Sequence, residues 1–341
     1  MKNLPKLILK IKNENGATFV FVALLMVFLL GITAIVIDVG RLYSEKSKLQ
    51  NALDAGVLGG AQLLLTEKPS PNLTPESVAM EIAKNNGLTL IDPIDSEDTN
   101  ITTDLNDKSI RATKKSKVPM TFARVIGIKE MEVNATAKAI LRPLKSGKGI
   151  TPIAVSSDVV KRDPNPRKLA NLTCTIKKNG NGNNKGNCGY LSLNGTGAKS
   201  LADAIINGSE MSIGGSNQGE QEDDAVAVST EPGTMLGQVK LAIDVLKKND
   251  ANKPQCQNYE TADNSCDRVI ILPVVQSWDN INGRATVTII GLAAYWIDGI
   301  NGKSISGQFI KMVGVGEIDR SASNPVGQFS QYNIQGVRLA E

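Results

Sequence analysis

The sequence predicts an α+β protein with a single N-terminal transmembrane helix that continues as a long helix, a small membrane-proximal α+β unit and a β-rich C-terminal domain. Three observations lead to this fold class. An uncharged apolar run occupies residues 17–37, a helical spacing of apolar residues continues beyond it, and strand-like segments fill much of the remaining chain. The 341 residues are enough for two ordinary domains.

The apolar run reads ATFVFVALLMVFLLGITAIVI, from Ala17 to Ile37. As a helix it would be roughly 30 Å long, which is the thickness of a hydrocarbon core. It exceeds the apolar region of a secretory signal peptide, and no small-residue cleavage site follows it, so we expect an uncleaved anchor. Four Lys residues precede the run, so the positive-inside rule predicts that residues 1–16 are cytoplasmic. The predicted location is therefore a cell membrane, crossed once, with most of the chain outside.

Beyond the run, a 3-4 spacing of apolar or small residues indicates that the helix continues. The positions are Val39, Leu42, Lys46, Leu49, Leu53, Gly56, Gly60 and Leu63, with Lys46 as the polar exception. Gly56 and Gly60 form a small-x-x-x-small pair, which permits two helix backbones to approach closely. Two interpretations of the face formed by Leu49, Leu53, Gly56 and Gly60 stay open. It packs on the protein's own domain, or it docks against another membrane-anchored subunit, which is the interpretation that we predict.

The stretch from Gly16 to Gln62 resembles the N-terminal domain of TadE/TadG-like proteins of the tight adherence (Flp) pilus assembly systems. The matching positions are Gly16, Asp38, Gly40, Arg41, Tyr43, Leu49, Gln50, Ala52, Asp54, Ala55 and Ala61. The resemblance implies a membrane-anchored, pseudopilin-like component whose partners are the lipid bilayer and other pilus-assembly subunits. Phe21 stands where prepilin-type substrates carry Glu, five residues after the Gly, which argues against cleavage after Gly16.

The membrane-proximal unit is predicted to span residues 38–143. A short helix is expected over 74–87, with Thr74 as N-cap, followed by strands near 99–105 and 108–114 that are joined by a turn at Asn106 and Asp107. A short amphipathic helix (PMTFARVIG) and a strand (MEVNATAKAILRP) complete the unit. This layout also resembles the family, whose members often carry an F-A-R-x-x-G segment like that at 122–127.

Residues 144–149 are predicted to be a linker, and residues 150–341 a β-rich extracytoplasmic domain. Strands are expected at 269–275, 285–300 and 304–318, and a helix at 234–249. This half resembles the C-terminal region of TadG-like proteins from Gram-positive bacteria. The resemblance rests on the TEPG, LPVV, GLAAYWIDGI and GQFI segments.

Four cysteines, Cys174, Cys188, Cys256 and Cys266, all follow the apolar run. An even number beyond a membrane anchor is typical of disulfides in an oxidising compartment. Four cysteines allow three pairings. We favour Cys174–Cys188 and Cys256–Cys266, because each pair brackets one polar loop.

The composition disfavours several classes of function. The chain has no histidine, the commonest general base and metal ligand. Its net charge of +4 is spread along the chain, and aromatic residues make up only 4%. We therefore expect a non-enzymatic protein with no cofactor, no metal, no nucleic acid partner and no small-molecule substrate. A stand-alone surface adhesin or binding module is the main alternative. An envelope hydrolase that uses Glu231 and the acidic residues upstream of it is a weaker one.

Overall fold

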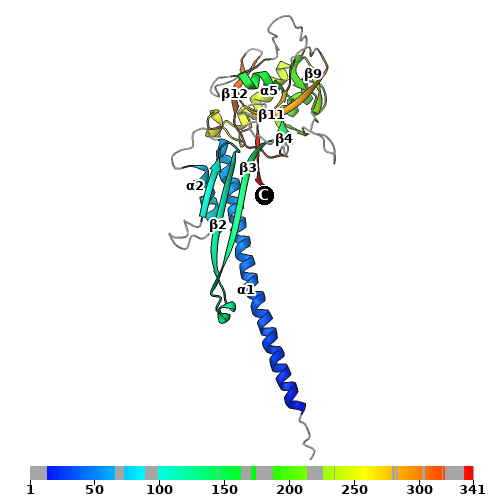
Figure 1. The fold of residues 1–341 in the computed structure, drawn as a ribbon. Coiled ribbons are helices and arrows are strands. Elements are labelled where there is room, and N and C mark those ends of the chain that lie inside the picture. Colours follow the sequence, from blue (N-terminus) through cyan, green and yellow to red (C-terminus); the bar gives the residue numbers. More distant parts are fainter. Residues whose placement is uncertain are drawn as a thin grey trace, which may run out of the picture.

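The computed structural model describes residues 14–65, 73–88, 99–144, 146–162, 170–173, 187–212, 226–233, 235–278, 281, 283–301, 304–316, 318 and 334–340. The molecule is elongated (Figure 1). A long helix projects from a small α+β unit, and a β-rich domain lies at the far end of that unit. The α+β fold class, with its apolar N-terminal helix, is confirmed.

The long helix α1 runs from Glu14 to Gln62 without a break and is followed by the 3-10 turn η1, Leu63–Leu65. Its N-terminal part is long and apolar enough to cross a membrane, and none of the most apolar stretch is buried inside the protein. Large side chains such as Phe21, Leu25 and Phe28 are exposed there. A helix that is apolar on all sides requires an apolar environment around it.

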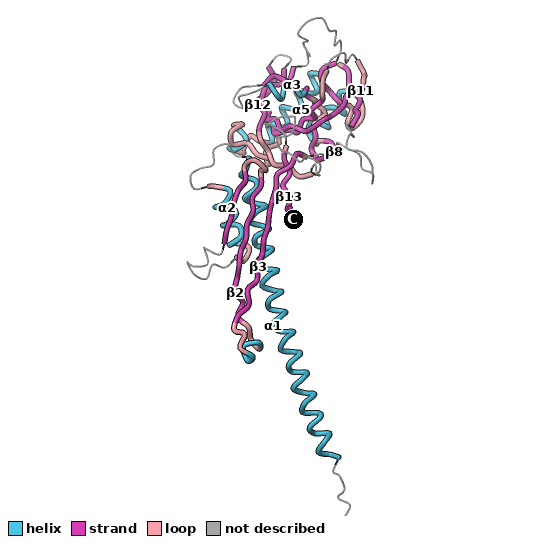
Figure 2. The backbone as a smooth tube through the Cα atoms, in the orientation of Figure 1, coloured by secondary structure: helices cyan, strands magenta, loops and turns pink. Residues whose placement is uncertain are grey.

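The membrane-proximal unit packs α1 and α2 (Pro75–Asn85) against a four-stranded antiparallel sheet of order β1-β2-β3-β13. The strands are β1 (Thr99–Asp104), β2 (Ser109–Pro119), β3 (Glu130–Pro143) and β13 (Gln335–Ala340), and the 3-10 turn η3 (Ala123–Ile126) lies between β2 and β3. Figure 2 shows β2 and β3 running alongside α1. The predicted N-cap of α2 is confirmed, because the Thr74 hydroxyl accepts the N–H of Ser77 at 3.1 Å.

The division of the chain differs from the prediction in two places. The last strand, β13, pairs antiparallel with β3, from Gln335 opposite Pro143 to Ala340 opposite Lys138. The C-terminal segment therefore belongs to the membrane-proximal sheet, not to the outer domain. In addition, most of the predicted linker is strand β4, Ser146–Ile150, which pairs with β8 and β10. The chain thus passes between the two units twice. Among the described residues, no free linker joins them.

The outer domain is built on one large sheet. Its main path is β6-β12-β11-β10-β4-β8, and β5, β7 and β9 join it from the side. The elements are β4, β5 (Val155–Ser156), α3 (Ser157–Arg162), β6 (Ala170–Thr173), β7 (Asn187–Leu191), α4 (Ala198–Asn207), β8 (Ser209–Ser212), β9 (Val226–Pro232), α5 (Leu236–Asn249), η4 (Pro254–Gln257), β10 (Val269–Val275), β11 (Thr286–Asn301) and β12 (Ser304–Ile310). The predicted strands at 269–275 and 285–300 and the helix near 234–249 are thereby confirmed, whereas the strand predicted at 304–318 ends at Ile310.

The central strand β11 is buried on both faces, which explains its nearly continuous apolar sequence. Tyr295 and Ile297 point into the core that contains α4 and α5, and the Tyr295 ring meets Phe309 edge-on at 5.0 Å. Trp296, between them, points into a second core on the opposite face. Alternation along one strand therefore fills two cores with different residues.

The predicted Cys256–Cys266 disulfide is present. It closes a loop beside β11, where the Cys256 carbonyl accepts the indole N–H of Trp296 at 2.9 Å. The Arg268 guanidinium lies 4.8 Å from the centre of the Trp296 ring. The other predicted pair, Cys174–Cys188, lies outside the residues whose side chains the structure describes.

Candidate assembly and membrane surface

The glycine face of α1 is the first candidate site, and it is covered by the protein itself. Leu49 and Leu53 are buried in the core between α1 and the sheet. A Cβ at Gly56 would lie 2.6 Å from the Ala79 carbonyl oxygen, and one at Gly60 would lie 2.5 Å from the Pro75 carbonyl oxygen. The small residues therefore allow α2 of the same chain to pack closely against α1. The prediction that this face docks against another subunit is wrong, because no part of it is left uncovered for a partner.

Asp38 is the first residue after the apolar run, and it fastens the β2–β3 hairpin to α1. Its carboxylate accepts the backbone N–H groups of Thr121 at 2.8 Å, Phe122 at 3.0 Å and Ala123 at 2.6 Å. Burial raises the pKa of this carboxyl, but the three N–H donors outweigh burial, and the pKa is held below its usual value. Asp38 therefore stays ionised and fixes the closed end of the hairpin at the end of the apolar run.

Two further family positions attach the helix to the hairpin. Arg41 donates a hydrogen bond to the Thr121 hydroxyl, next to the Asp38 contacts. Three helical turns further on, the Gln50 amide donates to the Thr136 carbonyl of β3 and to the Asp54 carboxylate, each at 2.9 Å. The motif residues thus join α1 to the sheet at two levels, which the sequence alone did not reveal.

Two other motif positions, Gly40 and Tyr43, make no comparable contact with the described residues. Open space surrounds the position that a Cβ on Gly40 would take. Tyr43 is largely exposed. Both lie on the part of α1 that emerges from the apolar run, and both face away from the rest of the described residues.

The closed end of the hairpin, residues 120–129, is called the hairpin tip from here on. The sequence predicts a short amphipathic helix at this place. The structure has instead the 3-10 turn η3, which ends at Gly127 with a left-handed φ of 93°. Val125 is 87% exposed and Ile126 is 78% exposed. The signal that was missed is the run of apolar residues in FARVIGI, whose large side chains no described element covers.

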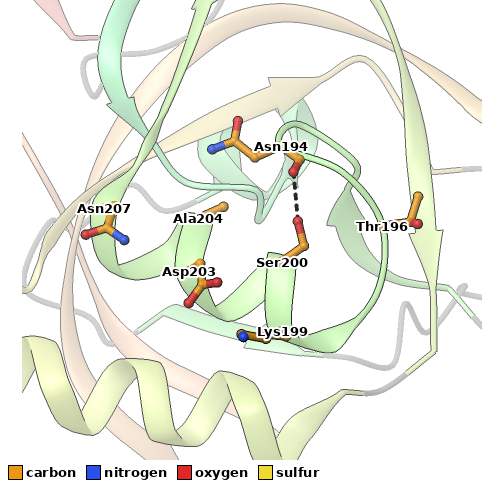
Figure 3. A pocket seen from close by; sticks show the side chains of 7 residues that line it. All are labelled: Asn194, Thr196, Lys199, Ser200, Asp203, Ala204 and Asn207. Atoms are coloured by element: carbon orange, nitrogen blue, oxygen red, sulfur yellow. Dashed lines mark hydrogen bonds between the residues drawn. The ribbon is translucent and has the colours of Figure 1, made fainter.

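The outer domain contains a polar hollow of about 450 Å³ beside α4 (Figure 3). Its lining residues are Asn194, Thr196, Lys199, Ser200, Asp203, Ala204 and Asn207. The Ser200 hydroxyl donates to the Asn194 carbonyl at 2.8 Å, so it is not paired with a side-chain base. The hollow therefore does not form the nucleophile and base arrangement of a hydrolase.

Glu231, the carboxylate considered for hydrolysis, is 5% exposed. It accepts hydrogen bonds from the Ser192 hydroxyl at 2.7 Å, the Gly197 N–H at 3.1 Å and the Arg284 guanidinium at 3.2 Å. Ser192 and Gly197 lie in the loop between β7 and α4, and Arg284 lies just before β11, so the carboxylate holds β9 to both segments. The acidic residues upstream of it, Glu220, Glu222, Asp223 and Asp224, lie outside the described part of the chain.

Asp250 lies close to the sulfurs of Cys256 and Cys266, and such a group can resemble a metal site. Here the two sulfurs are bonded to each other and offer no thiolate. The Asp250 carboxylate accepts the N–H groups of Asp267 at 3.0 Å and Arg268 at 2.8 Å. The group is therefore a structural cluster that closes the loop between α5 and β10.

The fold and these contacts define a class: a protein with one candidate membrane span among its described residues, whose helix continues into a small α+β unit. Residues 16–63 match a family model described as putative Flp pilus-assembly TadE/G-like. The match confirms the resemblance seen at residues 16–62, leaves the resemblance of the later segments untested, and supports a part in pilus assembly. Neither the curated proteins nor the solved structures gave a match.

Proposed function

We propose that the protein is a non-enzymatic, single-pass component of a Tad/Flp-type pilus assembly or secretion apparatus. Its N-terminus is cytoplasmic, and its α+β unit and outer domain are extracytoplasmic. The observation that carries the proposal is that the family match falls on one continuous helix, Glu14–Gln62. The same helix contains the apolar span and forms the core of the membrane-proximal unit.

The geometry supports a positioning role. Because α1 does not break between the span and the sheet, the orientation of the outer domain follows the orientation of the span. The contacts of Asp38 and Gln50 stiffen this connection at two levels. A protein built in this way holds a large domain at a set height above the bilayer, where other pilus-assembly subunits can bind it.

A gene deletion followed by complementation tests the proposal. We expect pilus numbers per cell, counted by electron microscopy, to fall in the deletion strain and to recover with the wild-type chain. Affinity purification of the intact protein from detergent-solubilised membranes should recover pilus-assembly proteins. Normal pilus numbers in the deletion strain would favour the stand-alone adhesin.

The non-enzymatic part of the proposal has its own test. Glu231→Gln keeps the shape of the buried side chain but removes its charge and replaces one of its two acceptor oxygens with an NH2 donor. We expect pilus numbers equal to those of the wild-type chain. Loss of pili with an unchanged outer-domain fold, checked by hydrogen exchange, would instead favour a carboxylate-dependent hydrolase. Asp203→Asn, in the polar hollow, is the matched control.

A further inference from the structure

We propose that the hairpin tip is a second membrane contact, which inserts its apolar side chains into the interfacial layer of the bilayer next to α1. The inference rests on the proposed membrane span. It assigns a lipid surface as the partner of residues 120–129. The family match at residues 16–63 does not include this segment.

The height of the tip follows from Asp38. This residue comes directly after Ile37, the last residue of the apolar run, and so marks the edge of the hydrocarbon core. Its carboxylate holds the backbone of residues 121–123 within hydrogen-bond distance. The hairpin points toward the N-terminal part of α1, with its tip beside the helix (Figure 1). The residues that follow Ala123 are therefore held at the level of the lipid headgroups.

The side chains at the tip suit an apolar environment. Val125 and Ile126 extend from η3, and the large side chains of Phe122, Ile128 and Met131 near them are also exposed. A contiguous apolar patch on a folded protein marks an interaction surface. The opposite end of the same hairpin sheet differs, because Leu105 is an isolated exposed apolar residue among Asp104, Asn106 and Asp107.

The charges at the tip favour a bilayer over a protein partner. Residues 120–129 contain Arg124 and Lys129 and no Asp or Glu. Both basic side chains are exposed and flank the apolar residues. An apolar knob bordered by basic residues is the pattern of interfacial segments, in which the stems lie along the acyl boundary and the cationic groups reach anionic headgroups. The continuity of the tip with the apolar end of α1 points to the same surface.

A second contact changes what the anchor can do. A single span leaves a protein free to tilt and to rotate about the helix axis. With the tip also in the interface, the sheet faces a fixed direction relative to the membrane plane. The outer domain is then presented to its partners in one orientation.

Depth-dependent quenching tests the inference on the full chain in vesicles of phosphatidylcholine and phosphatidylglycerol. An environment-sensitive fluorophore is attached to Ile126→Cys, and quenching by lipids with a doxyl group near the headgroup is measured. The matched control is Leu105→Cys, which is similarly exposed but lies roughly 35 Å away at 3.4 Å per residue of β2. We expect quenching at position 126 to be several-fold greater than at position 105. The parent chain gives the background labelling.

Two outcomes would overturn the inference, and one control separates it from the proposed span. Equal quenching at positions 126 and 105 would overturn the inference. Shielding of position 126 that appears only when other pilus-assembly proteins are added would overturn it in favour of a protein partner. A third label, Leu29→Cys in the apolar run, separates this failure from failure of the proposed span, because a membrane-spanning α1 must show deep quenching there. If the Ile126 variant does not fold, Val125→Cys gives the same measurement.

Discussion

Gly60→Ala probes the contact between α1 and α2 that replaced the predicted subunit interface. A Cβ at this position would lie 2.5 Å from the Pro75 carbonyl oxygen, 2.8 Å from the Ala79 Cβ and 2.9 Å from the Ile110 Cδ1. Two of these atoms belong to α2, so α2 must move away from α1. The substitution therefore weakens the membrane-proximal unit even though it adds only one methyl group.

The expected magnitude combines two opposing effects. Overpacking costs about 1–3 kcal/mol, and the upper part of this range, about 2–3 kcal/mol, applies here because three atoms would lie closer than 3.0 Å to the new methyl group. Replacing Gly by Ala inside a helix recovers about 1 kcal/mol. The net loss of stability is then about 1–2 kcal/mol, which corresponds to a roughly 5- to 30-fold rise in the population of opened states.

Hydrogen exchange of the full chain in detergent measures this directly. We expect amides of α2 and β2 to exchange roughly 5- to 30-fold faster in Gly60→Ala than in the wild-type chain. Gly40→Ala is the matched control on the same helix, because open space surrounds that position, and no loss of protection is expected. Unchanged exchange in Gly60→Ala would refute the internal packing. It would return this face to the role of a subunit interface, above all if recovery of partner proteins fell at the same time.

Two other predictions concern stability. Cys256→Ala removes the cross-link over a sequence separation of 10, which should cost roughly 2–3 kcal/mol and shift the fluorescence of Trp296, whose indole binds that loop; an unchanged urea midpoint followed by tryptophan emission would contradict this. Hydrogen bonds and charges from Lys138 and Arg142 lower the pKa of Asp107 from 3.8 to about 2, so its stabilising effect is complete above pH 3.8 and is lost as the pH falls through about 2. Asp107→Asn should therefore be less stable than the wild-type chain near neutral pH. The difference in urea midpoint should shrink below pH 3.8 and vanish below about pH 2, and a difference that persists there would show another cause.

Local sequence signals predicted the local structure of the membrane-proximal unit well. Thr74 and Pro75 marked the start of α2, because an N-cap hydroxyl and a first-turn proline satisfy the requirements of a helix start. Gly87 adopts a φ of 100°, which the predicted helix end requires. The hairpin turn at 105–108 lies where the polar residues Asn106 and Asp107 indicated it.

Contacts between distant segments could not be predicted in the same way. The small residues Gly56 and Gly60 indicated that a second backbone lies close to α1, but their spacing carries no information on which chain supplies it. Similarly, nothing in the sequence indicates that the backbone N–H groups of residues 121–123 donate to Asp38. Strand β13 pairs with β3, which is far away in the sequence. Because no short turn joins the two strands, no turn motif could predict this pairing.

The measurement that tests the central claim most directly is the sidedness of α1 in intact cells. Ser47→Cys lies on the exposed part of α1 beyond the apolar run, and Lys6→Cys precedes that run. A membrane-impermeant maleimide should label Ser47→Cys in intact, wall-permeable cells and should label Lys6→Cys only after the membrane is opened. Labelling of Lys6→Cys in intact cells, or protection of Ser47→Cys until the membrane is opened, would contradict the account of a single-span anchor with its folded units outside.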